Sequence, residues 1–266
     1  MNQPLGEMAA AFNTRAASYC RNEWHRTCAE RLVALCELPA GCRVLDACTG
    51  TGFAALAVAR VVGREGRVVG VDVSAGMLVE AERATLTSGL TNIEFVEGDA
   101  SQLPRYANGA FDAVMCAAGL LYLNVPAALR EWYRLLRRGG ILGFTTMRAG
   151  SPRAAQIFRD CAAAFGVPLQ DPSAELGKDE ACRQVLADAG FSVARVVCES
   201  IEFAPQDLSV AWESNFHSPA HAGVQRLSER EQQALRCQYL EALGVLQRQS
   251  PGELSLAEVL YAVGVR

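Results

Sequence analysis

The feature that most constrains the fold is an apolar segment that runs directly into a glycine-containing turn and then into an alanine-rich stretch. It reads Val44-Leu-Asp-Ala-Cys-Thr-Gly-Thr-Gly52, followed by Phe53–Val62. This order predicts a buried strand, a tight turn and a helix, and the glycines let a ligand approach the backbone closely. The helix would offer unpaired N–H groups and a positive dipole end to an anionic group. The segment therefore predicts a cradle for a nucleotide-type ligand.

Strand-like and helical segments alternate at short intervals after this turn, which is typical of crossover units and a parallel sheet. Ser74 is expected to cap a helix over Gly76–Ser88, and further helices are expected over Pro126–Arg138 and Glu180–Ala189. Ser228-Glu-Arg-Glu231 fits a capping box for a helix that runs to about Gln247. The expected strands are residues 43–47, 67–73, 93–96, 111–117, 141–146, 192–203 and 258–265.

The last of these strands follows a long excursion and could pair antiparallel with the strand before it. The expected fold class is α/β, a Rossmann-like, doubly wound, mostly parallel seven-stranded sheet with an antiparallel last strand and helical cap segments. The 266 residues suffice for one large domain. We expect a single domain over 1–266, with an N-terminal helical cap at 1–38, a cofactor-binding core at 39–147 and a second half at 148–266. A helical insertion at about 204–255 would form a substrate lid.

The charge and cysteine content exclude several classes of partner. A net charge of −4 argues against nucleic acid or an anionic membrane bound by broad electrostatics, so a small-molecule partner is expected, and a homodimer stays open. The N-terminus lacks a signal pattern and no apolar run reaches membrane length, which favours a cytoplasmic location. The 10 cysteines form no C-x-x-C pair and no zinc-like spacing with histidine, so no metal is expected.

Two enzyme classes share a glycine turn followed by an acidic residue after the next strand: nicotinamide oxidoreductases and class I S-adenosylmethionine methyltransferases. Asp72 is that acid, placed to hold ribose hydroxyls in either class. Gly50-x-Gly52-x-x-Ala55 satisfies the dinucleotide fingerprint in its alanine form, so the turn alone does not separate them. Asp46 favours the methyltransferases, because a carboxylate attracts a cationic amino group and sulfonium and gains nothing beside a pyrophosphate.

Two further features bear on this choice. Glu97-Gly98-Asp99 places a carboxylate after the third strand, where an adenine amino group could bind, although Gly-Asp also forms turns. Lys178 is the only lysine and no tyrosine precedes it by four residues, so the Tyr-x-x-x-Lys pair of short-chain dehydrogenases is missing.

With these features together, the chain resembles the class I S-adenosylmethionine-dependent methyltransferases, and among them the ubiquinone/menaquinone-biosynthesis type and many small-molecule methyltransferases. The resemblance covers roughly residues 12–147 strongly and the final strand weakly. Its marks are Phe12 with Tyr19, the 44–52 segment, Gly70-Val-Asp-Val-Ser74 with Met77-Leu78, Gly98-Asp-Ala100, Phe111-Asp112 and Leu135-Leu-Arg-Arg-Gly-Gly140.

The resemblance implies a role for each matching position of the cofactor site. The methionine end of the cofactor would be held by Asp46 and the turn through Ala47, Cys48, Gly50 and Gly52. Asp72 would hold the ribose, Val73 and Met77 would flank the adenine, Asp99 and Ala100 would contact its edge, Ala117 would lie beside the methyl group, and Tyr19 would close over the cofactor. Cys48 departs from the family pattern, which has a glycine or another small residue there. Because cysteine is disfavoured at positive φ, we expect an ordinary backbone conformation at this position.

The implied function is methyl transfer from S-adenosylmethionine to an oxygen, nitrogen or carbon atom of a small organic acceptor, by in-line displacement in a capped cleft. A base would help with a phenol, hydroxyl or carbon acceptor, by roughly 10²–10⁴-fold. Tyr122, His25, His217 and His221 are candidates, and His217 is preferred. Two alternatives stay open. A non-catalytic cofactor-binding or partner-binding module is suggested by Cys48 and by the lack of an obvious base. An NAD-dependent oxidoreductase is suggested by the alanine-form fingerprint.

Overall fold

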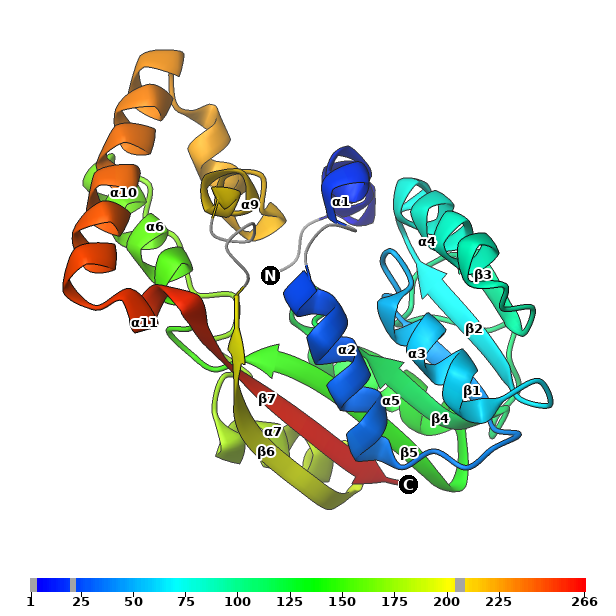
Figure 1. Ribbon diagram of the computed structural model, residues 1–266. Helices are drawn as coiled ribbons and strands as arrows, with labels where there is room; N and C mark the ends of the chain where they lie inside the picture. The colour runs from blue at the N-terminus through cyan, green and yellow to red at the C-terminus, as the bar shows by residue number, and fades with distance from the viewer. Residues whose placement is uncertain (1–3, 20–22, 204–208) are drawn as a thin grey trace.

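The computed structural model describes residues 4–19, 23–203 and 209–266, and its centre is a seven-stranded sheet in the order β3-β2-β1-β4-β5-β7-β6 (Figure 1). The strands are β1 Arg43–Ala47, β2 Arg67–Asp72, β3 Ile93–Glu97, β4 Phe111–Cys116, β5 Leu136–Met147, β6 Ser192–Glu202 and β7 Leu256–Val265. Only β7 runs against its neighbours, pairing antiparallel with both β5 and β6. The predicted fold class, with its antiparallel last strand, is confirmed.

Helices connect and cover these strands. They are α1 Leu5–Tyr19, α2 Glu23–Cys36, α3 Phe53–Val62, α4 Ala75–Ser88, α5 Val125–Leu135, α6 Arg153–Ala164, α7 Asp179–Asp188, α9 Ala211–Phe216, α10 Glu229–Gln249 and α11 Pro251–Ser255, with 3-10 turns η1 Leu120–Tyr122 and η2 Pro219–Arg226. In the part of the chain that the structure describes, no helix is both long and apolar enough to cross a membrane.

The alternation of side chains along β1 divides the core between the two faces of the sheet. Val44 joins a cluster that includes Leu32 of α2 and Val58 of α3. Leu45 joins the opposite cluster, which includes Trp132 of α5. Because successive side chains of a strand point to opposite faces, a strand whose consecutive residues Val44 and Leu45 are both apolar must be covered on both sides. Both faces of β1 are therefore buried. This packing holds the carboxyl end of the strand in position, where the glycine turn begins.

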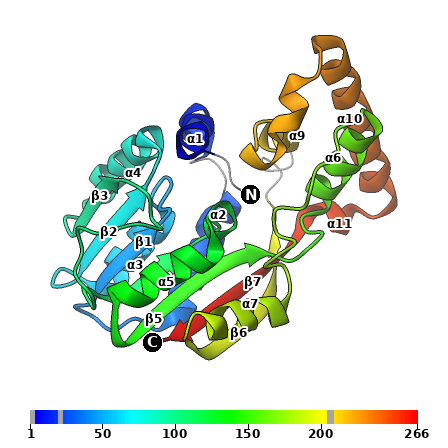
Figure 2. The same cartoon turned by 180° about the vertical axis from the view of Figure 1, so that it is seen from behind.

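Helices α6, α9, α10 and α11 of the second half of the chain form a separate group at one end of the molecule, whereas β6 and β7 belong to the sheet. Helices α6, α9 and α10 enclose an apolar cluster of their own, which includes Phe158, Trp212 and Tyr239. Both views show α1 lying between this group and α4 (Figures 1 and 2). The segment predicted as an insertion at about 204–255 contributes α9, η2, α10 and α11, and its residues 204–208 lie outside the described residues.

Most predicted boundaries agree with the structure within two residues. The Ser74 hydroxyl accepts a hydrogen bond from the Met77 N–H, and the capping box of Ser228 and Glu231 forms at the start of α10. The prediction that the helix after Pro126 runs to Arg138 is wrong, because α5 ends at Leu135 and β5 begins at Leu136. Leu136 pairs with Phe111 of β4, and this tertiary pairing outweighs the stop signal in the following glycines.

Candidate functional site

The turn after β1 is built from left-handed residues. Gly50 and Gly52 have φ values of 55° and 86°, and Cys48 has a φ of 57°. The expected ordinary conformation at Cys48 is therefore wrong. A left-handed non-glycine residue costs on the order of 1 kcal/mol and persists only where its surroundings hold it. Here the Cys48 side chain contacts the Cys116 thiol and lies over Gly119, where tertiary packing fixes the backbone.

Asp46 lies beneath this turn with its carboxylate only partly satisfied. Its exposed fraction is 1%, and one oxygen, Oδ2, accepts a hydrogen bond from the Thr49 hydroxyl at 2.5 Å. The other oxygen, Oδ1, has no hydrogen-bond partner in the described structure. Burial raises the pKa of Asp46 to about 7. A buried carboxylate with a free oxygen is costly alone and attracts a cationic group strongly.

Asp72, at the end of β2, joins two turns. Its Oδ2 accepts from the Gly50 N–H at 2.8 Å, and its Oδ1 accepts from the Ser74 N–H at 2.9 Å. Burial raises the pKa of Asp72, whereas these backbone donors lower it. The two bonds hold the carboxylate in one orientation, with lone pairs remaining for further donors.

A cavity of about 80 Å³ opens beside these residues. Eight of the predicted cofactor residues line it, namely Tyr19, Cys48, Gly50, Asp72, Val73, Met77, Ala100 and Ala117. A small adjoining space of about 30 Å³ is lined by Asp46 as well as Tyr19, Cys48 and Gly50. The turn, the β2 acid and the N-terminal helix therefore meet around these two adjoining spaces.

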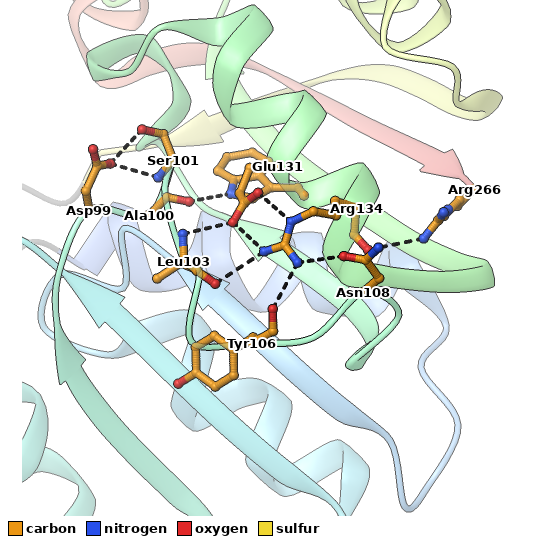
Figure 3. A network of polar contacts seen from close by, with 10 residues as sticks. Asp99, Ala100, Ser101, Leu103, Tyr106, Asn108, Glu131, Arg134 and Arg266 are labelled. Atoms are coloured by element: carbon orange, nitrogen blue, oxygen red, sulfur yellow. Dashed lines mark hydrogen bonds and ion pairs between the residues drawn. The ribbon is translucent and has the colours of Figure 1, made fainter.

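Three predicted residues do not line either space. Ala47 is fully buried beneath the turn, and Gly52 donates its N–H to the Thr49 carbonyl, so both shape the turn from behind. Asp99 accepts hydrogen bonds from the N–H and hydroxyl of Ser101 at 2.8 and 2.7 Å (Figure 3). That contact corresponds to the turn-forming interpretation of Gly-Asp.

Helix α1 supplies lining residues that the sequence argument did not assign. Leu5, Met8 and Phe12 face the same cavity as Met77. Their spacing of three and four residues is typical of one helix face and could have identified them. The Asn13 side-chain oxygen accepts from the Ser74 hydroxyl at 2.7 Å and from the Gly76 N–H at 2.8 Å, which fixes α1 against the start of α4.

A second and larger cavity, of about 190 Å³, adjoins the first and shares Tyr19, Ala118 and Tyr122 with it. Much of its wall is apolar, including Trp24, Leu121, Met147, Phe203 and Val259. It lies at the carboxyl ends of β4 and β5, where open α/β sheets bind their ligands. The volume suits a small organic molecule beside the first cavity.

Three of the four proposed bases line this second cavity, namely His25, Tyr122 and His221. His25 stacks between Trp24 and Tyr19, with ring centroids 3.5 and 4.3 Å away, and its Nδ1 lies 3.3 Å from the Tyr19 hydroxyl. Burial lowers the pKa of His25 to about 3, so the ring is neutral near pH 7. Tyr122 lines both cavities, and burial raises the pKa of its hydroxyl.

The structure brings His221, and not His217, to the cavity. His217 has a side chain that is 44% exposed, lies 3.3 Å from a Glu213 oxygen and is absent from the lining of either cavity. His221 is 3% exposed and its Nδ1 donates to the Asn215 carbonyl at 3.0 Å. Its Nε2 has no partner in the described structure, and burial lowers the pKa of the ring to about 4. His221 thus presents a neutral hydrogen-bond acceptor at the cavity wall.

Known methyltransferases are similar to this chain in sequence and in fold. Residues 44–140 match a family described as a methyltransferase domain. The ubiquinone/menaquinone biosynthesis C-methyltransferase of Coxiella burnetii is 37% identical over 120 residues, which are 44% of this chain and 48% of that protein. The first matching relatives are thus covered over about half their length. A crystal structure of a SAM-dependent methyltransferase from Aquifex aeolicus, 25% identical, superposes with a TM-score of 0.51 over 64% of this chain and 82% of that chain.

A longer match decides the family. The demethylmenaquinone methyltransferase of Listeria welshimeri is 33% identical over 178 residues, which are 60% of this chain and 74% of that protein. The chain belongs to the class I S-adenosylmethionine-dependent methyltransferase family. The oxidoreductase alternative is thereby set aside, since the alanine-form fingerprint on which it rested occurs in both classes.

The packing of Cys48 over Gly119 gives a test of how the turn after β1 is held in place. A Cβ at Gly119 would lie 2.5 Å from the Cys48 Cβ, so Gly119→Ala is expected to lower the free energy of unfolding by about 1–3 kcal/mol. Adding Cys48→Gly removes the clashing atoms and should restore most of that loss, a coupling that a double-mutant cycle in urea measures.

Gly98→Ala is the matched control, because a Cβ at Gly98 in the same cavity would meet nothing nearer than 3.9 Å. If the changes in the free energy of unfolding of Gly119→Ala and Cys48→Gly simply add in the double variant, the contact between these two residues does not determine the turn.

Proposed function

We propose that this chain transfers a methyl group from S-adenosylmethionine to a small organic acceptor bound in the 190 Å³ cavity. The single observation that carries the proposal is the shared wall of Tyr19, Ala118 and Tyr122 between the cavity beside Asp72 and the larger one. A donor in the first cavity and an acceptor in the second would meet at that wall, which is the arrangement that a direct transfer requires.

The residues present fit the cofactor. Asp46 has a buried oxygen without a partner, and a cationic amino group would satisfy it. The remaining lone pairs of Asp72 suit ribose hydroxyls, while Val73, Met77 and the half-buried Phe12 offer apolar surface to an adenine. We further propose that Asp99, Ala100 and Ala117 contact the adenine edge and the methyl region.

When bound, S-adenosylmethionine supplies an electrophilic methyl group on a cationic sulfur. The role of the protein is to position the acceptor and exclude water, for which Trp24, Leu121 and Phe203 provide apolar walls. His221 stays neutral near pH 7 and can accept a hydrogen bond from an acceptor hydroxyl through Nε2. It therefore replaces His217 as the preferred polar contact for the acceptor, whereas Tyr122 is part of the shared wall and His25 lies beside Tyr19.

Other parts of the proposal rest on composition. The net charge of −4 supports a small-molecule acceptor over nucleic acid or a membrane surface. We also propose a cytoplasmic location and a role in small-molecule biosynthesis. The segment from α9 to α11 is proposed to form a helical lid. A homodimer stays open.

Calorimetric titration with S-adenosylmethionine and S-adenosylhomocysteine tests the function. Both should bind the full chain, and Asp72→Ala should weaken both at least about tenfold, because it removes two turn contacts and the ribose acceptor. His217→Ala is the control and should bind normally, since that side chain is exposed. Absence of binding by the wild type would refute the proposal.

The second candidate is a non-catalytic module that binds the cofactor. The left-handed Cys48 favours it, because a strained residue replaces the family's small one at the turn. Turnover of any acceptor, followed as production of S-adenosylhomocysteine, would exclude it.

A further inference from the structure

The larger cavity carries an unusual charge for a mostly apolar space. Among the described residues that line it, the charged side chains are Arg15, Arg159 and Asp171. Its two histidines, His25 and His221, are held neutral by burial, which lowers the pKa of both. Two guanidinium groups therefore face one carboxylate, and one positive charge is left over.

Arg159 of α6 is the more buried of the two arginines, with an exposed fraction of 8%. Its Nη2 lies 3.3 Å from the Asp171 Oδ2. That carboxylate is already shared, because Oδ2 also accepts from the Gly150 N–H at 2.7 Å and Oδ1 accepts from the Ser173 N–H at 2.9 Å. A guanidinium has five donors, so one shared carboxylate leaves it with donors to spare. Burial lowers the pKa of Arg159, whereas the neighbouring carboxylates of Asp171 and Asp160 raise it.

Arg15 approaches the same cavity from α1. Its guanidinium carbon lies 5.8 Å from the Phe12 ring centroid and 5.7 Å from that of Tyr19. Within the described ranges, no carboxylate lies at ion-pair distance from Arg15. Aromatic faces attract a cation but do not neutralise it. The excess positive charge of the cavity therefore lies on Arg15 and Arg159 together.

His221 adds a different contact beside these arginines. Its Nδ1 hydrogen is engaged by the Asn215 carbonyl, so Nε2 carries a lone pair that is buried and unpartnered. A ligand hydroxyl would satisfy this atom, whereas a ligand anion would not. The cavity thus offers cationic donors and one neutral acceptor within an apolar wall.

We propose that the acceptor is a flat, apolar molecule that carries a carboxylate, bound by Arg159 and Arg15, with a hydroxyl directed to His221. Asp171 is a positioning residue that orients Arg159. A monoanion matches the single uncompensated charge, whereas a phosphate would bring a charge of about −1.5 to −2 into the apolar wall. This inference rests on the proposed methyl transfer and names the substrate class of the same site.

The experiment compares 2-hydroxybenzoate with 2-hydroxybenzamide, which have nearly the same size and differ by one negative charge. Each is titrated calorimetrically into the full chain saturated with S-adenosylhomocysteine. The benzoate is expected to bind about tenfold more tightly, because charge-assisted hydrogen bonds to guanidinium are the stronger kind. In Arg159→Gln this preference should fall to about twofold or less.

Two variants keep the result interpretable. Arg153 lies on the same helix, but its guanidinium is 3.8 Å from Glu253 and outside the cavity. Arg153→Gln should therefore retain the preference for the benzoate over the benzamide. Arg15→Gln should reduce the preference without touching the Asp171 pair, which covers the case in which Arg159→Gln fails to fold. Equal affinity for the two compounds, no binding of the benzoate at millimolar concentration, or a preference unchanged in both cavity variants would overturn the inference. Failure of S-adenosylhomocysteine to bind would instead refute the proposed function, so the two failures are distinguishable.

Discussion

Asp46→Asn is expected to weaken S-adenosylmethionine binding about a hundredfold, because it removes the buried charge that would face the cationic end of the cofactor. The variant keeps the shape of the side chain and an oxygen that can accept from Thr49. Calorimetry at pH 8 measures the effect. A dissociation constant within about threefold of the wild type would contradict the assignment of Asp46 to this role.

Although Asp46→Asn should weaken cofactor binding, it should not lower the stability of the cofactor-free protein. The pKa of Asp46 is raised from 3.8 to about 7 by burial, so the folded state binds the proton more tightly than the unfolded chain. Without cofactor, the contribution of Asp46 to stability is therefore greatest below about pH 4 and is lost as the pH rises to about 7. The amide of Asp46→Asn cannot ionise, so the cofactor-free variant should be at least as stable as the wild type at pH 8 in urea unfolding.

Cofactor affinity of the wild type should depend on pH for the same reason. Below about pH 7 the Asp46 carboxyl must release its proton before it can hold a cation, so affinity falls as the pH falls. The pH dependence of binding between pH 5 and 7 should be much reduced in Asp46→Asn. If the variant keeps the same pH dependence, a group other than Asp46 causes it.

Trp132→Ala is expected to cost about 3–5 kcal/mol of stability. The Trp132 side chain is fully buried in α5, and its Nε1 donates to the Ala100 carbonyl at 2.8 Å. Beside it, Glu131 accepts from the Leu103 N–H and pairs with Arg134, so one helix fastens the segment from Ala100 to Asn108 (Figure 3). The loss should also loosen the adenine side of the cofactor cavity, because Ala100 lines it.

Trp132→Phe separates the two contributions, since it keeps most of the apolar volume and loses the hydrogen bond, worth about 1 kcal/mol. Urea unfolding measures both variants, and Tyr133→Ala serves as a control at a half-buried neighbour. A loss below about 1 kcal/mol in Trp132→Ala would show that this contact does not hold the segment.

The sequence was sufficient for the parts of the fold that follow from local pattern. β1, the glycine turn and α3 lie at their predicted positions because apolar runs, glycines and alanines act within a few residues of one another. The start of β5 at Leu136 differs from the prediction because Gly139 and Gly140 resemble the glycines that follow a helix end. In the structure, Arg137 pairs with Asp112 across the sheet, at 2.5 Å, which no local pattern contains.

The cofactor side of the site was more predictable than the acceptor side for a physical reason. Asp46 and Asp72 end adjacent parallel strands, so topology alone brings them together. The larger cavity, which we propose binds the acceptor, is instead assembled from α1, α6, the loop at Asp171 and η2, which are distant in sequence. The left-handed backbone of Cys48 likewise depends on Gly119, some 70 residues away, and could not be inferred from the turn.

Helix α1 lines both cavities. Met8 and Phe12 line the cavity beside Asp72, Arg15 lines the larger cavity, and Tyr19 lines both. Under the proposed function, we expect movement of α1 to accompany departure of both the demethylated cofactor and the methylated product. Rapid-mixing measurements should then resolve one common release phase whose rate responds to contacts such as the hydrogen bonds from Ser74 and Gly76 to Asn13.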